Sequence, residues 1–268
     1  MTLPRTVMSI LVLLAVTAAG AQDRKDTTEL AKTAQNPVAD LVSLPVQYDI
    51  NGEVAGTEQY QSVFNIQGIY PFHVSDRYNL ITRGNLPIIS QPGVLSQDSR
   101  QGGIGDVEIT ALFSPVLPGK WIWGAGPVAT LPTASKASMG TDKLGLGLAA
   151  DVLRMHGPWV YGAKFNNVWG VAGSGNQDSN RMHLQPFVNY NFSDGWYAVS
   201  APTITANWEA SSGNQWTIPI GAGAGKVFYG GSQPMNAAVH YYYNLDKPST
   251  GSLWTLRLYF QLLFPKHR

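Results

Sequence analysis

Hydrophobic and polar residues alternate along much of this chain with a period of two. Successive side chains of a β-strand point to opposite faces, so the alternation predicts strands with one apolar and one polar face. The run at 252–264 shows this most clearly. Its polar parity contains Arg257, Tyr259 and Gln261, and its apolar parity contains Leu256, Leu258, Phe260, Leu262 and Phe264. Such a run, near a C-terminus and closing on an aromatic residue, is typical of the last strand of an outer-membrane β-barrel, although a soluble β-sandwich could also contain it.

Similar runs recur along the chain, separated by clusters of Gly, Pro, Asn and Asp that indicate turns. Pro87, Pro127, Pro186, Pro202 and Pro219 lie in or near these runs. Each proline removes a backbone donor, so we expect these residues at bulges or near the membrane interfaces. Twelve strands are predicted, at 44–52, 58–71, 77–89, 104–115, 121–132, 144–154, 159–171, 181–192, 196–209, 215–227, 235–244 and 252–264.

The connections between these runs alternate in length. Those at 73–76, 117–120, 155–158 and 193–195 are short, whereas those at 90–103, 133–143 and 172–180 are long and polar. Short periplasmic turns and longer outer loops are the rule in outer-membrane barrels, and an even number of strands leaves both termini in the periplasm. The sequence therefore predicts an all-β fold, an antiparallel transmembrane β-barrel of about twelve strands over residues 44–268.

The N-terminus has the layout of a secretory signal peptide. A positive charge in residues 1–5 precedes an apolar run at 7–18, and small residues at 19–21 predict cleavage before Gln22. The apolar run is shorter than the ~20 residues that a membrane-spanning helix needs. We therefore assign 1–21 to a signal peptide and 22–43 to an N-terminal periplasmic segment or plug, either disordered or forming a short helix at the barrel mouth.

Composition narrows the function. The chain has no Cys, which excludes disulfides, thiolate nucleophiles and Cys-ligated metals, and its formal net charge of +1 gives no basic footprint for nucleic acid. Its mean hydropathy of −0.08 is close to neutral, as expected when one face of each strand meets lipid and the other meets water. We therefore expect the protein to contact outer-membrane lipids and not to bind nucleic acid.

The polar parity of the predicted strands supplies the candidate site. A charged side chain on the lipid face of a barrel costs about 2–4 kcal/mol near the bilayer midplane, so these residues should point into the lumen. They could select a solute, or they could pair with one another, Arg83 with Asp106 or Glu108 for example, and fill a narrow barrel. The predicted lumen-lining residues are Asn79, Arg83, Asp106, Glu108, Lys164, Asn166, Gln185, His240, Arg257 and Gln261.

Two further features, a glycine run and a set of tryptophans, are better explained by a structural role than by ligand binding. Gly221, Gly223 and Gly225 share one face of the tenth run, without the following helix that a phosphate-binding loop needs, and predict a strip of inner wall that lacks side chains. Seven tryptophans near predicted strand ends suit the aromatic belts at the two membrane interfaces. They are Trp121, Trp123, Trp159, Trp196, Trp208, Trp216 and Trp254.

An outer-membrane lipid-modifying enzyme is the main alternative class. It would need a Ser nucleophile beside a His, and Ser179 with His183 is the one candidate pair near the outer side. No Ser-His-acid spacing and no metal-ligand spacing accompanies it. We therefore predict no catalytic residue, no metal site and no cofactor, and we do not expect an enzyme.

Short segments along the chain also carry a resemblance. They are 44–47 (LPVQ), 123–127 (WGAGP), 131–133 (LPT), 185–191 (QPFVNYN), 194–197 (DGWY), 216–221 (WTIPIG) and 263–266 (LFPK). Together they resemble a family of outer-membrane proteins associated with the meta-pathway of phenol degradation, many of whose members carry the label neuromedin U. The resemblance implies a barrel with a transport or channel role. It brings no catalytic or substrate-binding residues.

The sequence thus predicts an outer-membrane channel of a Gram-negative bacterium, passing small organic solutes through a polar-lined barrel. The family resemblance favours aromatic or hydrophobic solutes. The C-terminal strand is the expected contact with the barrel-assembly machinery. A lipid-modifying barrel enzyme and a structural barrel that transports nothing are the alternatives.

Overall fold

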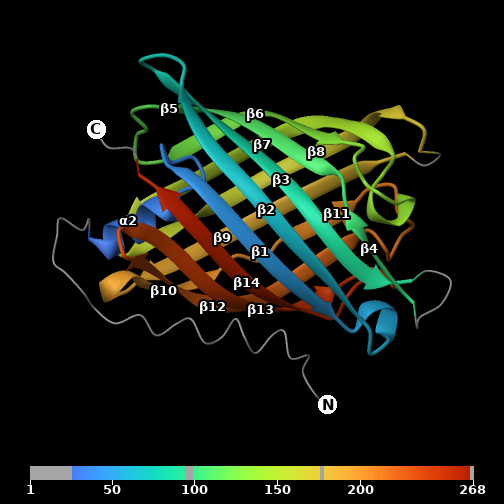
Figure 1. The fold of residues 1–268 in the computed structure, drawn as a ribbon. Helices are drawn as coiled ribbons and strands as arrows, with labels where there is room; N and C mark the ends of the chain where they lie inside the picture. The colour runs from blue at the N-terminus through green and yellow to red at the C-terminus, as the bar shows by residue number, and fades with distance from the viewer. Residues whose placement is uncertain (1–25, 94–98, 176–177, 266–268) are drawn as a thin grey trace.

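A computed structural model describes residues 26–93, 99–175 and 178–265 of the chain, so the predicted signal peptide lies outside the described residues. The strands form one antiparallel sheet that closes on itself, because β1 pairs with β2 on one side and with β14 on the other (Figure 1). The strands are β1 (Val42–Gly52), β2 (Tyr60–His73), β3 (Tyr78–Pro92), β4 (Arg100–Ile104), β5 (Val107–Pro115), β6 (Ile122–Leu131), β7 (Lys143–His156), β8 (Trp159–Gly173), β9 (Asn180–Asn191), β10 (Trp196–Ser200), β11 (Ile204–Asn207), β12 (Trp216–Gly230), β13 (Gln233–Asp246) and β14 (Trp254–Phe264).

The fourteen strands occupy twelve positions around the barrel. β4 and β5 both pair with β3, and β10 and β11 both lie between β9 and β12, so each of these two pairs is one interrupted strand. The predicted twelve-stranded barrel is confirmed, and each predicted run overlaps one barrel position. The predicted loop at 90–103 is the main difference, since β3 continues to Pro92 and pairs there with β4.

Alternate residues of each strand face the inside and the outside of the barrel, as the alternation in the sequence predicts. On β14, Gln261 and Leu263 are buried inside the barrel, whereas Phe260 and Phe264 are exposed outside it. On β13, Asn236, His240 and Asn244 are buried, and the alternate residues Val239, Tyr241 and Tyr243 are exposed. On these two strands the outer face is therefore apolar, and the polar side chains point inside.

Short and long connections lie at opposite ends of the barrel. The turn end carries the tight connections, for example between β7 and β8, where Gly157 adopts the left-handed φ of +56° that an L-residue rarely takes. The start of β1, the end of β14 and helix α2 (Thr27–Ala34) lie at this end as well (Figure 1). The opposite end, called the loop end below, carries the longer connections.

Helix α2 is capped and amphipathic, which explains why so short a segment is helical. Asp26 accepts a hydrogen bond from Thr28 N at 2.8 Å as the N-cap, and Lys32 in the last turn pairs with Glu29 in the first at 2.7 Å. Its apolar residues Leu30 and Ala31 are buried against the barrel. No helix in the described part of the chain is long and apolar enough to span a membrane.

The prolines lie where strand pairing is interrupted. Pro87 faces the break between β4 and β5, and Pro127 lies where the β5–β6 pairing jumps from Thr110–Val128 to Phe113–Ala125. Pro219 lies at a register shift between β12 and β13. Pro202 separates β10 from β11, and Pro186 lies in the neighbouring stretch of β9. A missing backbone donor explains why each position falls at an irregularity.

Candidate functional site: the barrel lumen

Three cavities follow one another through the barrel. An outer cavity of about 480 Å³ lies at the loop end, a central cavity of about 130 Å³ follows it, and a turn-side cavity of about 210 Å³ comes last. His183 lines both the outer and the central cavity. Gln67, Arg83, Lys164 and Gln185 line both the central and the turn-side cavity. Shared walls make the three cavities a series along the lumen.

The central cavity is lined by charged side chains from β3, β5, β7 and β8. Arg83 forms an ion pair with Asp151 and also donates from Nη2 to the carbonyl oxygen of Pro37 at 2.7 Å. The predicted pairing of Arg83 with Asp106 or Glu108 is therefore wrong. The intervening strand β6 carries Gly124 directly opposite Asp151, and Val38 of the N-terminal segment lies where a side chain at Gly124 would be.

Lys164 and Glu108 face the same central cavity without a close ionic partner. Among the described residues, neither forms an ion pair within 4.0 Å. Both side chains line the cavity with Arg83 and Asp151. Because Arg83 and Asp151 neutralise each other, Lys164 and Glu108 are the charges that a solute in this cavity would meet.

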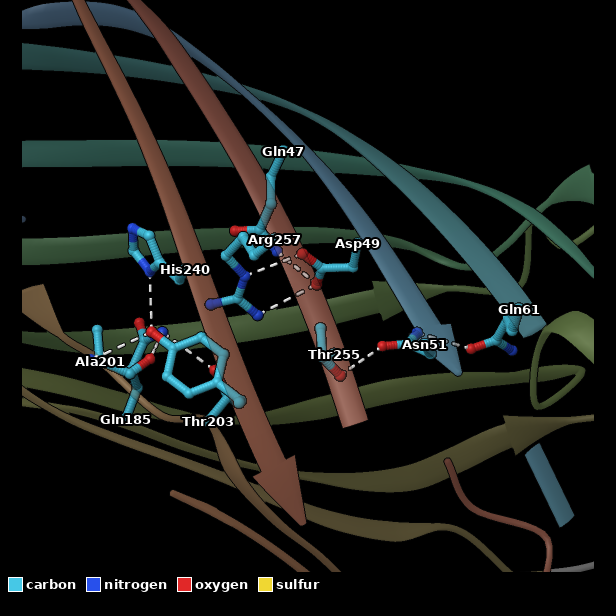
Figure 2. Close-up of polar contacts among 11 residues, drawn as sticks. Gln47, Asp49, Asn51, Gln61, Gln185, Ala201, Thr203, His240, Thr255 and Arg257 are labelled. Carbon is cyan, nitrogen blue, oxygen red and sulfur yellow. Dashed lines mark hydrogen bonds and ion pairs between the residues drawn. The ribbon is translucent and has the colours of Figure 1, made fainter. Parts of the chain in front are cut away.

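A second ion pair lies across the wall where the barrel closes. Arg257 on β14 donates from Nε and Nη2 to the two carboxylate oxygens of Asp49 on β1, at 2.9 and 3.1 Å. Gln47 donates to the same carboxylate at 2.8 Å. Farther along these strands Thr255 bonds to Asn51, and Asn51 bonds to Gln61 of β2, so that the polar inner face continues toward the loop end (Figure 2).

The predicted glycine strip on β12 faces inward and is covered by rings. A Cβ atom on Gly221 would meet Tyr242, one on Gly223 would meet His240, and one on Gly225 would meet Tyr197. His240 Nδ1 and the Tyr242 hydroxyl lie 2.8 Å apart and are hydrogen bonded. The glycines therefore let aromatic side chains of neighbouring strands lie flat against the wall.

The segment after α2 enters the turn end of the lumen. Gln35 and Asn191 exchange two amide hydrogen bonds, at 2.9 and 3.0 Å, and Pro37 accepts the bond from Arg83. Val38 packs into an apolar cluster of inward-facing residues. This apolar inner layer was not predicted from the sequence; it includes Ile81, Leu112, Val128, Leu153, Val160, Val168 and Phe187.

Two of the ten predicted lumen residues do not line the central or the turn-side cavity. Asn79 is at the turn end, 3.1 Å from His73 Nδ1. Asp106, at the break before β5, accepts hydrogen bonds from Ala134 N, Thr141 N and Thr141 Oγ1, and so holds the 132–142 connection. The residues that line the cavities are Arg83, Glu108, Lys164, Asn166, Gln185, His240, Arg257 and Gln261.

The enzyme alternative gains no geometric support. His183 lies inside the barrel, where its Nδ1 is 3.0 Å from Asn166 Oδ1, and no hydrogen bond joins it to Ser179 in the described structure. Within residues 26–93, 99–175 and 178–265, no group of three or more His, Asp or Glu side chains could hold a metal ion.

Comparison with solved structures places this fold among outer-membrane barrels. An outer membrane channel from Pseudomonas putida F1 superposes with a TM-score of 0.62 at 17% sequence identity, over 84% of this chain and 96% of that channel. The NanC porin gives a TM-score of 0.50 at 9% identity, over 84% of this chain and 100% of the porin. No protein-family profile and no curated protein sequence match the chain. The membership in the phenol-degradation family therefore stays a prediction.

Proposed function

We propose that the protein is an outer-membrane channel that admits small organic solutes through its lumen. The observation that carries the proposal is the series of three cavities, which share His183 at one junction and Arg83, Lys164 and Gln185 at the other. A packed structural barrel would have no reason to leave charged side chains such as Lys164 and Glu108 facing open space. The likeness to barrels described as a channel and a porin supports the same function.

The outer surface supports the membrane location. Apolar side chains such as Leu148, Ile220 and Val239 are exposed on the outside of the wall, where water would leave them unfavourably hydrated and lipid would not. Trp121, Trp159 and Trp196 lie at the turn end, at the depth of an aromatic belt. We place the turn end in the periplasm, with outer-membrane lipids around the wall and β14 as the strand offered to the barrel-assembly machinery.

The N-terminal segment is proposed to restrict the periplasmic end of the path. It is held by the Gln35–Asn191 pair, by the Pro37–Arg83 bond and by the apolar contacts of Val38. It also lines the turn-side cavity with Gln35, Asn36 and Pro37. This arrangement supports a plug formed by residues 35–41, with helix α2 at the barrel mouth before it.

The lining supports uncharged solutes. The charged side chains that line the central and turn-side cavities are Arg83, Glu108, Asp151, Lys164 and Arg257. Arg83 is paired with Asp151, and Arg257 is paired with Asp49, which lies outside the lining. The two that remain, Lys164 and Glu108, have opposite signs. Aromatic rings of Tyr197, Tyr259 and Phe187 line the path beyond them. Small aromatic or otherwise hydrophobic solutes, as in the phenol-degradation family that the sequence resembles, fit such a lining.

Single-channel recording in planar bilayers tests the proposal. We expect discrete conductance steps from the purified protein, and several-fold larger steps from a variant that lacks residues 26–41 because the turn end is then open. Gln35→Leu, which removes the two side-chain bonds with Asn191 and leaves the bond from Asn191 to Pro158 O, serves as the matched partial release and should give brief visits to the larger conductance. Absence of conductance from all three proteins would instead favour a structural barrel, and lipid hydrolysis by the purified protein would favour the enzyme.

A further inference from the structure

An arginine lies on the outer wall near the turn end of the barrel. Arg154 comes two residues before the end of β7, and it shares the parity of Leu148 and Val152, which are 64% and 41% exposed on the outside. The alternate residues Asp151 and Leu153 are buried inside. Arg154 therefore points away from the lumen. A cation on this face needs a partner for its charge, because lipid hydrocarbon cannot hydrate it.

Two aromatic side chains lie beside Arg154. Trp121 directly precedes β6, and Tyr161 is opposite Arg154 in the β7–β8 register. The Arg154 guanidinium carbon lies over the Trp121 ring, 5.9 Å from its centre, and the Trp121 and Tyr161 rings meet edge to face with their centres 6.1 Å apart. Stacking on a ring orients a planar guanidinium and leaves its N–H edge open to an acceptor. We call these three residues the Arg154 site.

The Arg154 guanidinium has no acceptor in the described part of the chain. It forms neither a hydrogen bond nor an ion pair with residues 26–93, 99–175 or 178–265. Arg100 at the loop end shows the opposite case. It also lies over a ring, that of Tyr60 at 4.3 Å, but it donates to Tyr60 O at 3.0 Å and to Ser90 O at 3.2 Å. The N–H groups of Arg154 are thus available to an external acceptor.

The surroundings of the Arg154 site fit an anion that is attached to an apolar tail. The β5–β6 and β7–β8 connections beside the site contain Lys120 and no Asp or Glu. Toward the middle of the wall, the outward residues of β7 are Val152, Ala150 and Leu148, which are all apolar and exposed. A phospholipid matches both parts, because its phosphate accepts paired N–H bonds from a guanidinium and its acyl chains cover the apolar strip.

We propose that the Arg154 site binds the headgroup of an anionic phospholipid in the periplasmic leaflet of the outer membrane. Arg154 donates to the phosphate, Trp121 and Tyr161 lie beside the glycerol, and the acyl chains follow β7 toward the middle of the wall. An anionic headgroup fits better than phosphatidylethanolamine, because the two connections beside the site offer no carboxylate to its ammonium group. The proposal rests on the membrane location proposed above and not on the passage of solutes.

Native mass spectrometry of the purified protein in detergent, with one probe added at a time, tests the proposal. The probes are dioleoyl phosphatidylglycerol, dioleoyl phosphatidylethanolamine and inorganic phosphate. The test variant is Arg154→Gln, and the matched control is Arg100→Gln, which removes the ring-stacked arginine of the loop end. Arg154→Lys keeps the charge but loses the paired donors, and it provides a second test should Arg154→Gln fail to fold. Heat-modifiable migration in gel electrophoresis shows that each variant is folded.

We expect the parent protein and Arg100→Gln to retain phosphatidylglycerol with the same apparent Kd, and Arg154→Gln to bind it several-fold more weakly. Arg154→Lys should fall between them. The parent protein should bind phosphatidylethanolamine several-fold more weakly than phosphatidylglycerol and should not retain inorganic phosphate.

Equal retention of phosphatidylglycerol by the parent protein and by both Arg154 variants would overturn the site, as would an equal loss in Arg100→Gln. Equal retention of the two phospholipids would overturn the choice of an anionic headgroup, and retention of inorganic phosphate would overturn a lipid as the ligand. Retention of neither phospholipid by a protein that inserts into vesicles would also overturn the site. Failure of the parent protein to insert into vesicles would instead reject the membrane location.

Discussion

Arg257 and Asp49 form a two-point ion pair between the last and the first strand of the barrel, with N–O distances of 2.9 and 3.1 Å. The two residues are directly opposite in the β1–β14 register, so the pair joins the two ends of the folded chain. Both side chains are 12% exposed, which protects the interaction from water and salt.

Removal of one partner should destabilise the closed barrel. Losing one member of a buried, hydrogen-bonded charge pair costs on the order of 3–5 kcal/mol, and we expect a smaller loss, about 1–3 kcal/mol, because this pair borders a cavity. Urea unfolding of Asp49→Asn and Arg257→Gln in lipid vesicles, followed by tryptophan fluorescence, measures it. The double variant should lose less free energy of unfolding than the two single variants together. A loss equal to their sum would show that the two residues do not interact.

The glycine strip of β12 should tolerate no side chain. A Cβ atom on Gly223 would meet the backbone of Val239 and the His240 ring, so Gly223→Ala should lower the free energy of unfolding by about 1–3 kcal/mol through overpacking. Gly84→Ala on β3 is the control, because nothing lies within 4 Å of its Cβ position. Equal stability of the two variants in the same urea titration would refute the close approach of the rings to the wall.

The period-two pattern and the alternation of short and long connections together predicted the barrel. Each predicted run overlaps one barrel position, and the alternation of short and long connections gave the two ends correctly. Parity also placed Arg257 and Gln261 inside and Phe260 outside, because a strand allows its side chains no other choice.

The pattern could not predict contacts across the lumen. Arg83 and Asp151 lie on strands separated by β5 and β6, and only the closure of the wall into a barrel brings them together. The apolar inner layer was missed for a related reason: Leu112 and Val128 have the inward parity, but their partner Val38 belongs to a segment outside the barrel strands.

Lys164 and Glu108 should set the ion selectivity of the lumen in opposite directions. Both face the central cavity, and neither is neutralised by a close partner among the described residues. Lys164→Gln should therefore shift the reversal potential in a salt gradient toward cation preference, and Glu108→Gln toward anion preference. Shifts of the same sign, or no shift in either variant, would contradict the position assigned to these charges on the path.

The most direct test of the lumen as the path is thiol modification at two neighbouring positions of β8. Lys164 faces the central cavity, whereas Phe165 is exposed on the outer wall. Lys164→Cys and Phe165→Cys are each recorded as single channels while a charged, water-soluble methanethiosulfonate reagent is added. We predict a stepwise fall in current for Lys164→Cys that a reductant reverses, and an unchanged current for Phe165→Cys. A Lys164→Cys channel whose thiol is modified, as shown by mass spectrometry, but whose current does not change would contradict passage through this lumen.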